Sequence, residues 1–129
     1  MAEKDVIRTD RAPGPFQGAP YNQAIRVGDL VFVAGQLGIS LETGELLGAG
    51  VAEQTEQIMA NLGAILEAAG SGLDRLVKTT VFLVDLRDFA AMNEVYAKHV
   101  GERPPARSTV QISGQPSGAL VEIEAIAHT

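Results

Sequence analysis

The chain contains no cysteine and only two histidines, His99 and His128. Without cysteine it can form no disulfide, no thiolate metal site and no cysteine nucleophile. The two histidines do not have the spacing of metal ligands, so a zinc site is not expected. Dinucleotide-binding and phosphate-binding glycine motifs are also absent. These absences exclude thiolate chemistry and argue against a zinc site and against nucleotide cofactors held by such motifs.

Long apolar runs and basic residues are scarce as well. No segment approaches membrane-spanning length, and the first residues contain no apolar run of signal-peptide length. We therefore expect an unprocessed cytoplasmic protein with no membrane partner. Ten lysines and arginines stand against sixteen acidic residues, for a net charge of -6. Because nucleic-acid-binding proteins usually carry a basic surface, this balance argues against a nucleic-acid partner.

The length and composition are those of one globular domain. The chain has 129 residues, 46% of them apolar and 20% charged. We expect a single domain over residues 1–129 that begins with a loop segment at 1–15. Residues 11–24 contain five glycines and prolines, which predicts an ordered loop; this loop carries Phe16 and Tyr21.

The strand and helix patterns that follow alternate along the chain. β-branched and aromatic residues predict a buried strand at 30–36, and a turn then leads to a short strand at 46–47. Apolar residues recur at intervals of three and four from Val51 to Ala69, which predicts an amphipathic helix. Gly70 is expected to end that helix.

A second strand and helix are predicted after it. The strand covers 77–84, and the helix begins near Asp88 as the N-cap. Its buried stripe is expected to contain Phe89, Met92 and Tyr96. Two further strands follow, at 107–113 and 120–127. The resulting order, β-β-β-α-β-α-β-β, predicts a two-layer α+β fold in which both helices cover one face of a mixed sheet.

Alternation in the last two strands suggests what the other face of the sheet carries. Residues expected to face the helices are Val110, Ile112, Val121, Ile123, Ala125 and Ala127. Residues expected to face away are Arg107, Thr109, Gln111, Leu120, Glu122, Glu124 and Ile126. This second face could be solvated, with weak surface ion pairs. It could also be buried against other subunits, and the apolar Leu120 and Ile126 favour that alternative.

Several segments resemble the YjgF/YER057c/UK114 family, also called the Rid family. In the first half they are Gly18-Ala19-Pro20-Tyr21-Asn22-Gln23-Ala24 and Val33-Ala34-Gly35-Gln36-Leu37-Gly38. In the second half they are Val77-Lys78-Thr79-Thr80-Val81-Phe82, Asp88-Phe89, Met92-Asn93-Glu94-Val95-Tyr96, Pro105-Ala106-Arg107-Ser108 and Val121-Glu122-Ile123-Glu124-Ala125-Ile126-Ala127. The resemblance covers nearly the whole chain from about residue 12, with the segments in the family's order.

The resemblance implies a chorismate-mutase-like fold, a homotrimer whose sheets form a central barrel, and ligand clefts between subunits. It implies a deaminase that hydrolyses 2-iminopropanoate or 2-iminobutanoate to 2-keto acids and ammonia, without a cofactor. By the same resemblance Arg107 would bind the substrate carboxylate, Glu122 would activate water and Tyr21 would close the cleft. Asn93 and the backbone of Gly35 would line the cleft.

This sequence departs from the family pattern at three places. Thr109 occupies the position that is commonly cysteine, so its backbone is expected to contribute to substrate binding. Ala34 replaces a frequent serine. The loop Ser113-Gly114-Gln115-Pro116 lacks the leucine that usually precedes the proline.

Each assignment has a structural alternative. Arg107 and Glu122 could instead connect subunits, Tyr21 could be a packing aromatic residue, and Asn93 could cap or pair on its helix. For the whole protein, the alternatives are a trimer that binds small carboxylates without catalysis and an endoribonuclease or translation inhibitor. The presence of Arg107 argues against the first, and the acidic charge balance argues against the second.

Overall fold

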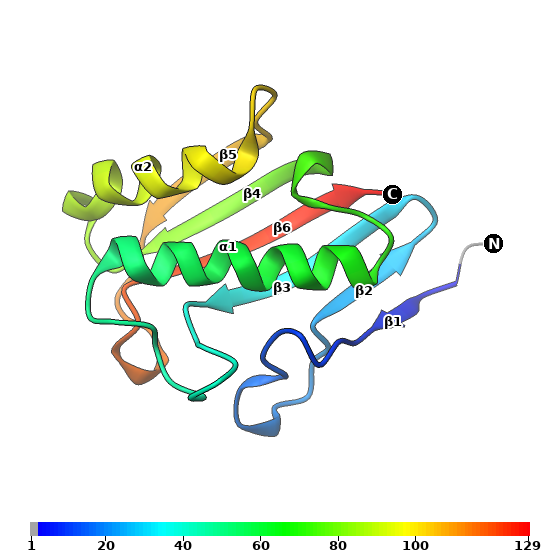
Figure 1. The fold of residues 1–129 in the computed structure, drawn as a ribbon, viewed down its shortest axis with the longest axis horizontal. Coiled ribbons are helices and arrows are strands. Elements are labelled where there is room, and N and C mark those ends of the chain that lie inside the picture. Colours follow the sequence, from blue (N-terminus) through cyan, green and yellow to red (C-terminus); the bar gives the residue numbers. More distant parts are fainter. Residues whose placement is uncertain (1–2) are drawn as a thin grey trace.

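Two helices lie against one face of a six-stranded mixed sheet (Figure 1). The structure is a computed structural model, and it describes residues 3–129. The elements are β1 (Asp5–Ile7), β2 (Ala24–Val27), β3 (Leu30–Leu37), α1 (Val51–Ala68), β4 (Leu76–Leu83), α2 (Phe89–Val100), β5 (Ala106–Gln111) and β6 (Val121–His128). The spatial order of the strands is β1-β2-β3-β6-β4-β5, and only the β4–β5 pair is parallel. The predicted α+β class and element order are confirmed.

The positions of two of the first three strands differ from the prediction. β1 lies within the segment 1–15 that was predicted to be a loop, and β2 follows residues 11–23. The predicted strand at 46–47 is wrong, because only an isolated bridge joins Ile39 to Leu46. A two-residue turn joins β2 to β3, and Gly28 at its first position has φ of 58°, as a type II′ turn requires.

The core lies between the helices and the sheet. Ile58, Met59 and Leu62 of α1 are fully buried there, and the inner residues of β6 are the four predicted ones: Val121, Ile123, Ala125 and Ala127. α1 ends as predicted, with Gly70 at φ of 81° and a hydrogen bond from the N–H of Ser71 to the carbonyl of Leu66. Because α1 and β6 have long, regular patterns, burial follows their periodicity.

The second helix differs in two details. Met92 and Tyr96 are buried as predicted, but the Phe89 residue is 42% exposed. Asp88 stands at the N-cap position of α2 without making a side-chain capping bond. The carboxylate of Asp85 instead accepts the backbone N–H of Arg87, in the short turn that precedes α2.

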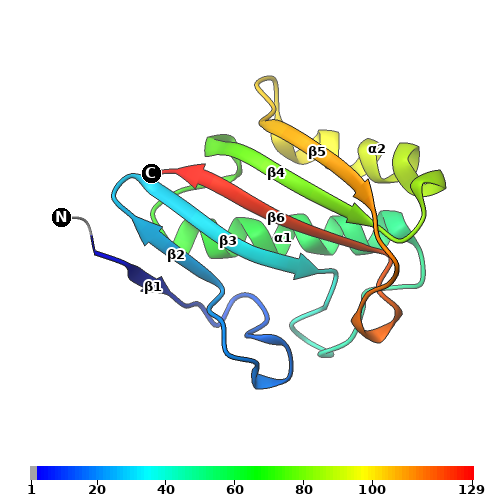
Figure 2. The same cartoon turned by 180° about the vertical axis from the view of Figure 1, so that it is seen from behind.

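The opposite face of the sheet carries no helix (Figure 2). Four apolar residues are paired in register across β1, β2, β3 and β6 on this open face: Val6, Ile25, Phe32 and Ile126. Val6 and Phe32 are 47% and 43% exposed. Leu120 is not part of this face, because it precedes β6 and packs against the core. The open face therefore presents an apolar row to its surroundings. Of the two apolar residues predicted for this face, Ile126 is confirmed and Leu120 is wrong.

Candidate active site

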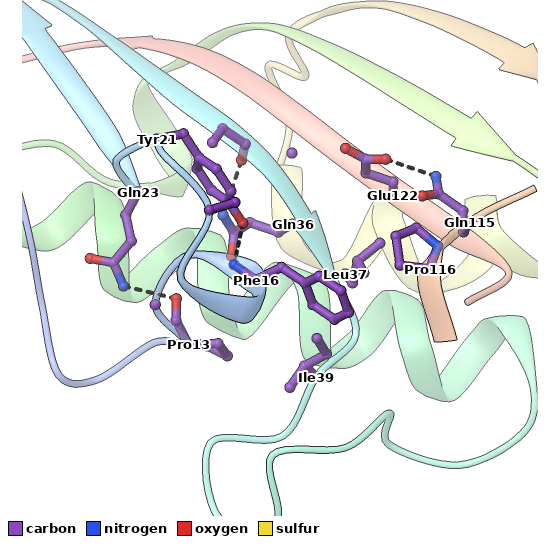
Figure 3. Close-up of a pocket in the computed structure, with 14 residues that line it drawn as sticks. Pro13, Phe16, Tyr21, Gln23, Gln36, Leu37, Ile39, Gln115, Pro116 and Glu122 are labelled. Atoms are coloured by element: carbon purple, nitrogen blue, oxygen red, sulfur yellow. Dashed lines mark hydrogen bonds between the residues drawn. The ribbon is translucent and has the colours of Figure 1, made fainter. Parts of the chain in front are cut away.

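A pocket of about 410 Å³ opens between the N-terminal loop, the end of β3 and the loop before β6 (Figure 3). Three residues singled out in the sequence line it: Tyr21, Gly35 and Glu122. Its other walls are mostly apolar and include Phe16, Leu37, Ile39 and Pro116. Glu122 is thus a single carboxylate in a largely apolar hollow, which is an environment suited to acid–base chemistry.

The Glu122 side chain faces away from the helices. Val121 and Ile123 on either side of it are fully buried beneath the helices, so alternation directs Glu122 to the open face. Its neighbours in the sheet are Leu37 of β3 and Phe82 of β4. The side chain is half-buried, and its Oε1 accepts a hydrogen bond of 2.7 Å from Nε2 of Gln115.

A bulge in β3 brings Gly35 against this carboxylate. The pairing of β3 with β6 shifts by one residue between Val33 and Gln36, so Ala34 and Gly35 form the irregular part of the strand. A Cβ at Gly35 would lie 2.7 Å from Cδ of Glu122 and closer still to Oε2. Only glycine therefore leaves room for the Glu122 carboxylate in its present position.

The variant Gly35→Ala should displace the Glu122 carboxylate without unfolding the protein. The backbone of Gly35 needs no positive φ, and the colliding atoms belong to the end of a movable side chain. We expect the melting temperature to change little and kcat for the activity proposed below to fall about tenfold, because a small misplacement of a catalytic group is costly. Thermal unfolding and steady-state kinetics measure the two effects.

Gly63→Ala is the matched control. Its Cβ would lie 3.4 Å from Leu73, at ordinary contact distance, in the middle of α1 and outside the pocket. Alanine there should raise the free energy of unfolding by about 0.5–1 kcal/mol and leave kcat unchanged. If Gly35→Ala were as active as Gly63→Ala, close approach to Gly35 would not matter for the function of Glu122.

Tyr21 stands on the other side of the pocket, on the N-terminal loop. Its Oη accepts a hydrogen bond of 2.6 Å from the backbone N–H of Phe16, and its own hydroxyl proton remains free to be donated. The buried Gln23 fastens the same loop, since its Nε2 lies within 3.2 Å of the carbonyl oxygens of Thr9, Ala12 and Pro13. The loop is therefore held in place although Tyr21 itself is 41% exposed.

Arg107 lies on the helix side of the sheet, which contradicts the prediction that it shares a face with Glu122. It is paired with Thr79 of β4, and the Thr79 hydroxyl is hydrogen-bonded to the Tyr96 hydroxyl of α2 at 2.6 Å. The Arg107 guanidinium carbon is 4.9 Å from the centre of the Tyr96 ring and 5.5 Å from that of Phe89. Stacking on these rings favours the helix side for a charged residue of the edge strand β5.

The inversion affects the other residues of β5. Thr109 is paired with the buried Val81, so it too lies on the helix side and is half-buried. Val110, predicted to face the helices, is instead 41% exposed on the open face. Arg107 and Thr109 therefore remain together, but the sheet separates both from Glu122.

Arg107 and Thr109 of β5 form a second cluster with Phe89, Asn93 and Tyr96 of α2. Within residues 3–129 no carboxylate forms an ion pair with Arg107, so its guanidinium is available to an external anion. Asn93 lies between Phe89 and Tyr96 on the same side of α2, and its buried Oδ1 meets no donor from the described part of the chain. Burial raises the pKa of the Tyr96 phenol, while Thr79 and the positive Arg107 oppose that rise.

Several residues near these clusters were not identified from the sequence. Gln115 holds the Glu122 carboxylate by a hydrogen bond across a turn. Gln23 holds the N-terminal loop by hydrogen bonds to residues 10 to 14 positions earlier in the chain. Phe16, Leu37 and Ile39 form the apolar wall. Over residues 3–129 there is no group of three or more histidine, cysteine or acidic side chains that could hold a metal ion. No helix in the same range is both long and apolar enough to cross a membrane.

Comparison with known proteins finds relatives over nearly the whole chain. Residues 11–129 match the family described as Endoribonuclease L-PSP. A RutC family protein of Pyrococcus abyssi is 51% identical over 97% of this chain and 97% of its own. The 2-iminobutanoate/2-iminopropanoate deaminase of Homo sapiens is 42% identical over 95% of this chain and 88% of its own.

Solved structures agree with these relatives. RidA from the Antarctic bacterium Psychrobacter sp. PAMC 21119 superimposes with a TM-score of 0.91 at 45% identity, covering 97% of this chain and 99% of the other. TdcF of E. coli, solved with bound serine, superimposes with a TM-score of 0.88 at 40% identity, covering 97% and 98%. The similarity extends over the fold and over the segments that carry both clusters.

Proposed function

The chain belongs to the YjgF/YER057c/UK114 (Rid) family, and from this premise we propose that it hydrolyses small 2-imino acids to 2-keto acids and ammonia. The observation that carries the proposal is the presence of two unlike groups, one on each side of the sheet. One is the carboxylate of Glu122 in a largely apolar pocket. The other is the Arg107 guanidinium, which stacks on the rings of Tyr96 and Phe89 and forms no ion pair within residues 3–129. A 2-imino acid requires both, since it joins a carboxylate to an electrophilic C=N carbon.

Arg107 would bind the substrate carboxylate. Its guanidinium offers two parallel N–H donors, which fix the plane of a carboxylate as well as its position. The unpaired Oδ1 of Asn93 could accept an N–H from the bound molecule. Serine, the molecule bound in the TdcF structure, likewise carries a carboxylate next to a nitrogen-bearing carbon. Thr109 would contribute mainly through its backbone.

Glu122 would activate water. A water molecule adds its oxygen to C2 of the protonated imine while Glu122 takes one proton, which gives a carbinolamine. Glu122 then returns the proton to nitrogen. The C2–N bond breaks as the hydroxyl becomes the keto carbonyl, and its proton leaves with the ammonia. Tyr21 can donate its hydroxyl proton at the pocket rim, and Phe16, Leu37 and Ile39 offer an apolar surface to the substrate side chain.

The two clusters can meet only if two copies of the chain contribute. The sheet separates Arg107 from Glu122 within one protomer. The apolar row of Val6, Ile25, Phe32 and Ile126 leaves a surface that would favour burial by a neighbour. The family resemblance implies three subunits, so we propose a homotrimer in which the Glu122 face of one subunit lies against the Arg107 edge of the next.

The expected solution mass is three times the 13.6 kDa of the chain. Light scattering at micromolar concentration measures it. Phe32→Glu should weaken the assembly, because it places a charge in the middle of the apolar row. A monomer for the parent protein would contradict the shared site.

A coupled assay tests the activity. An amino-acid oxidase generates the imino acid, and the release of ammonia or keto acid is compared with the spontaneous rate. We expect a rate that rises in proportion to the protein concentration. Binding of a keto acid without acceleration would support the non-catalytic alternative, and salt-sensitive RNA cleavage would support the endoribonuclease alternative.

A further inference from the structure

We propose that Gln115 is a positioning residue for the Glu122 carboxylate, a role that rests on the deaminase function proposed above. Its Nε2 donates a hydrogen bond of 2.7 Å to Oε1 of Glu122, and both side chains line the same pocket (Figure 3). No other hydrogen bond from residues 3–129 reaches this carboxylate. Among the residues that the structure describes, Gln115 is therefore the hydrogen-bond partner that fixes the orientation of the Glu122 carboxylate.

The bond makes the two carboxylate oxygens unequal. Oε1 accepts the hydrogen bond from Gln115. Oε2 lies against the backbone of Gly35 and accepts no hydrogen bond from the described part of the chain. Oε2 is therefore the oxygen left to take a proton from water. A carboxylate that rotates freely would spend part of its time with neither oxygen correctly aimed, so fixing one oxygen favours the reactive arrangement.

The loop that carries Gln115 is itself fastened. Gln115 precedes a short turn at Pro116–Gly118, and the N–H of Leu120 after that turn donates to Oε1 of Gln54 at 2.8 Å. Gln54 belongs to α1 and is 1% exposed. The carbonyl of Leu120 accepts the N–H of Val84 at 3.1 Å. The hydrogen bond to Glu122 therefore extends from an anchored segment rather than from a free loop end.

The resemblance to the family leads one to expect leucine before the proline of this loop, and leucine can donate no hydrogen bond. An apolar residue would complete the pocket wall but would leave the orientation of Glu122 to packing alone. Gln115 adds a hydrogen bond to a charged acceptor, the stronger kind of side-chain contact.

The variants Gln115→Met and Gln115→Leu test the role. Both keep an apolar wall and remove the donor. We expect kcat to fall about tenfold and KM to change less than about threefold, because substrate binding depends on Arg107. The melting temperature and the oligomeric mass should match those of the parent. Gln57→Met, which removes an amide from α1 outside the pocket, is the control and should keep the parent kcat.

Coupling to Glu122 distinguishes positioning from a general effect on the pocket. In a Glu122→Gln background, assayed at high protein concentration, Gln115→Met should change the residual rate less than about twofold, because no proton acceptor remains to be oriented. Two results would overturn the role of Gln115 while leaving the deaminase function intact. One is an equal loss from Gln115→Met in the parent and in the Glu122→Gln background. The other is a parent-like kcat in both Gln115→Met and Gln115→Leu. A parent protein without imine hydrolysis would overturn the deaminase function and this role with it.

Discussion

The Glu122→Gln variant should stay folded and assembled but hydrolyse 2-imino acids roughly 10²- to 10⁴-fold more slowly, the usual contribution of a positioned acid–base group. Glutamine has nearly the same shape, and its carbonyl oxygen can still accept the hydrogen bond from Gln115. The variant thus removes the proton acceptor while the wall of the pocket is retained. Affinity for a 2-keto acid, measured by calorimetry, should remain close to that of the parent.

Glu124→Gln is the matched control. Glu124 stands one pleat further along β6 on the same open face, is exposed and does not line the pocket that contains Glu122. The Glu124→Gln variant removes the same charge from the same face of the sheet. Provided that its oligomeric mass equals that of the parent, its kcat should remain close to that of the parent. A Glu122→Gln variant that turned over the imine at the parent rate would show that another group activates the water.

Much of the fold could be predicted because its longest elements have regular patterns. α1 repeats its apolar residues over 18 positions, and β6 alternates between faces over eight. Residues 5–7 and 24–27 were missed as strands for the opposite reason. Three or four residues carry too little periodicity to be distinguished from a loop. These two strands are defined by tertiary pairing, β1 with β2 and β2 with β3.

The error at Arg107 has a specific cause. Alternation places Arg107 and Val110 on opposite faces but cannot say which of them faces the helices. Hydrophobicity favours Val110 on the inside, and that rule fails because β5 is an edge strand next to the exposed end of α2. The rings of Phe89 and Tyr96 give the guanidinium a favourable surface there.

The arrangement of the candidate site residues could be predicted only in part. Tyr21, Gly35 and Glu122 do line one pocket, and Arg107, Asn93 and Thr109 lie along the other side of the sheet. Sequence alone could not reveal the bulge at Gly35, because an extra residue in a strand leaves no mark in its composition. It could not single out Gln115 either, since a glutamine in a loop has no pattern that predicts its partner.

Removing the Arg107 guanidinium should mainly weaken the binding of the substrate carboxylate. Arg107→Ala is expected to raise KM and the dissociation constant of a 2-keto acid roughly 10²-fold, because a charge-assisted contact is worth about 3 kcal/mol. Arg107→Lys should recover only part of this, since lysine keeps the charge but loses the planar stack on Tyr96 and the two parallel donors. Arg103→Ala, in the exposed loop before β5, is the control with unchanged binding.

Mixing two inactive variants then tests whether the site is shared. If each site takes Glu122 from one subunit and Arg107 from the next, Arg107→Ala and Glu122→Gln chains refolded together should form some sites with both native residues. For random assembly of equal amounts, roughly one quarter of the sites would be complete, and about that fraction of the parent activity should return. The separately refolded variants give the baseline. If both residues served a site within one chain, no mixed trimer could contain a complete site, and the activity would stay at that baseline.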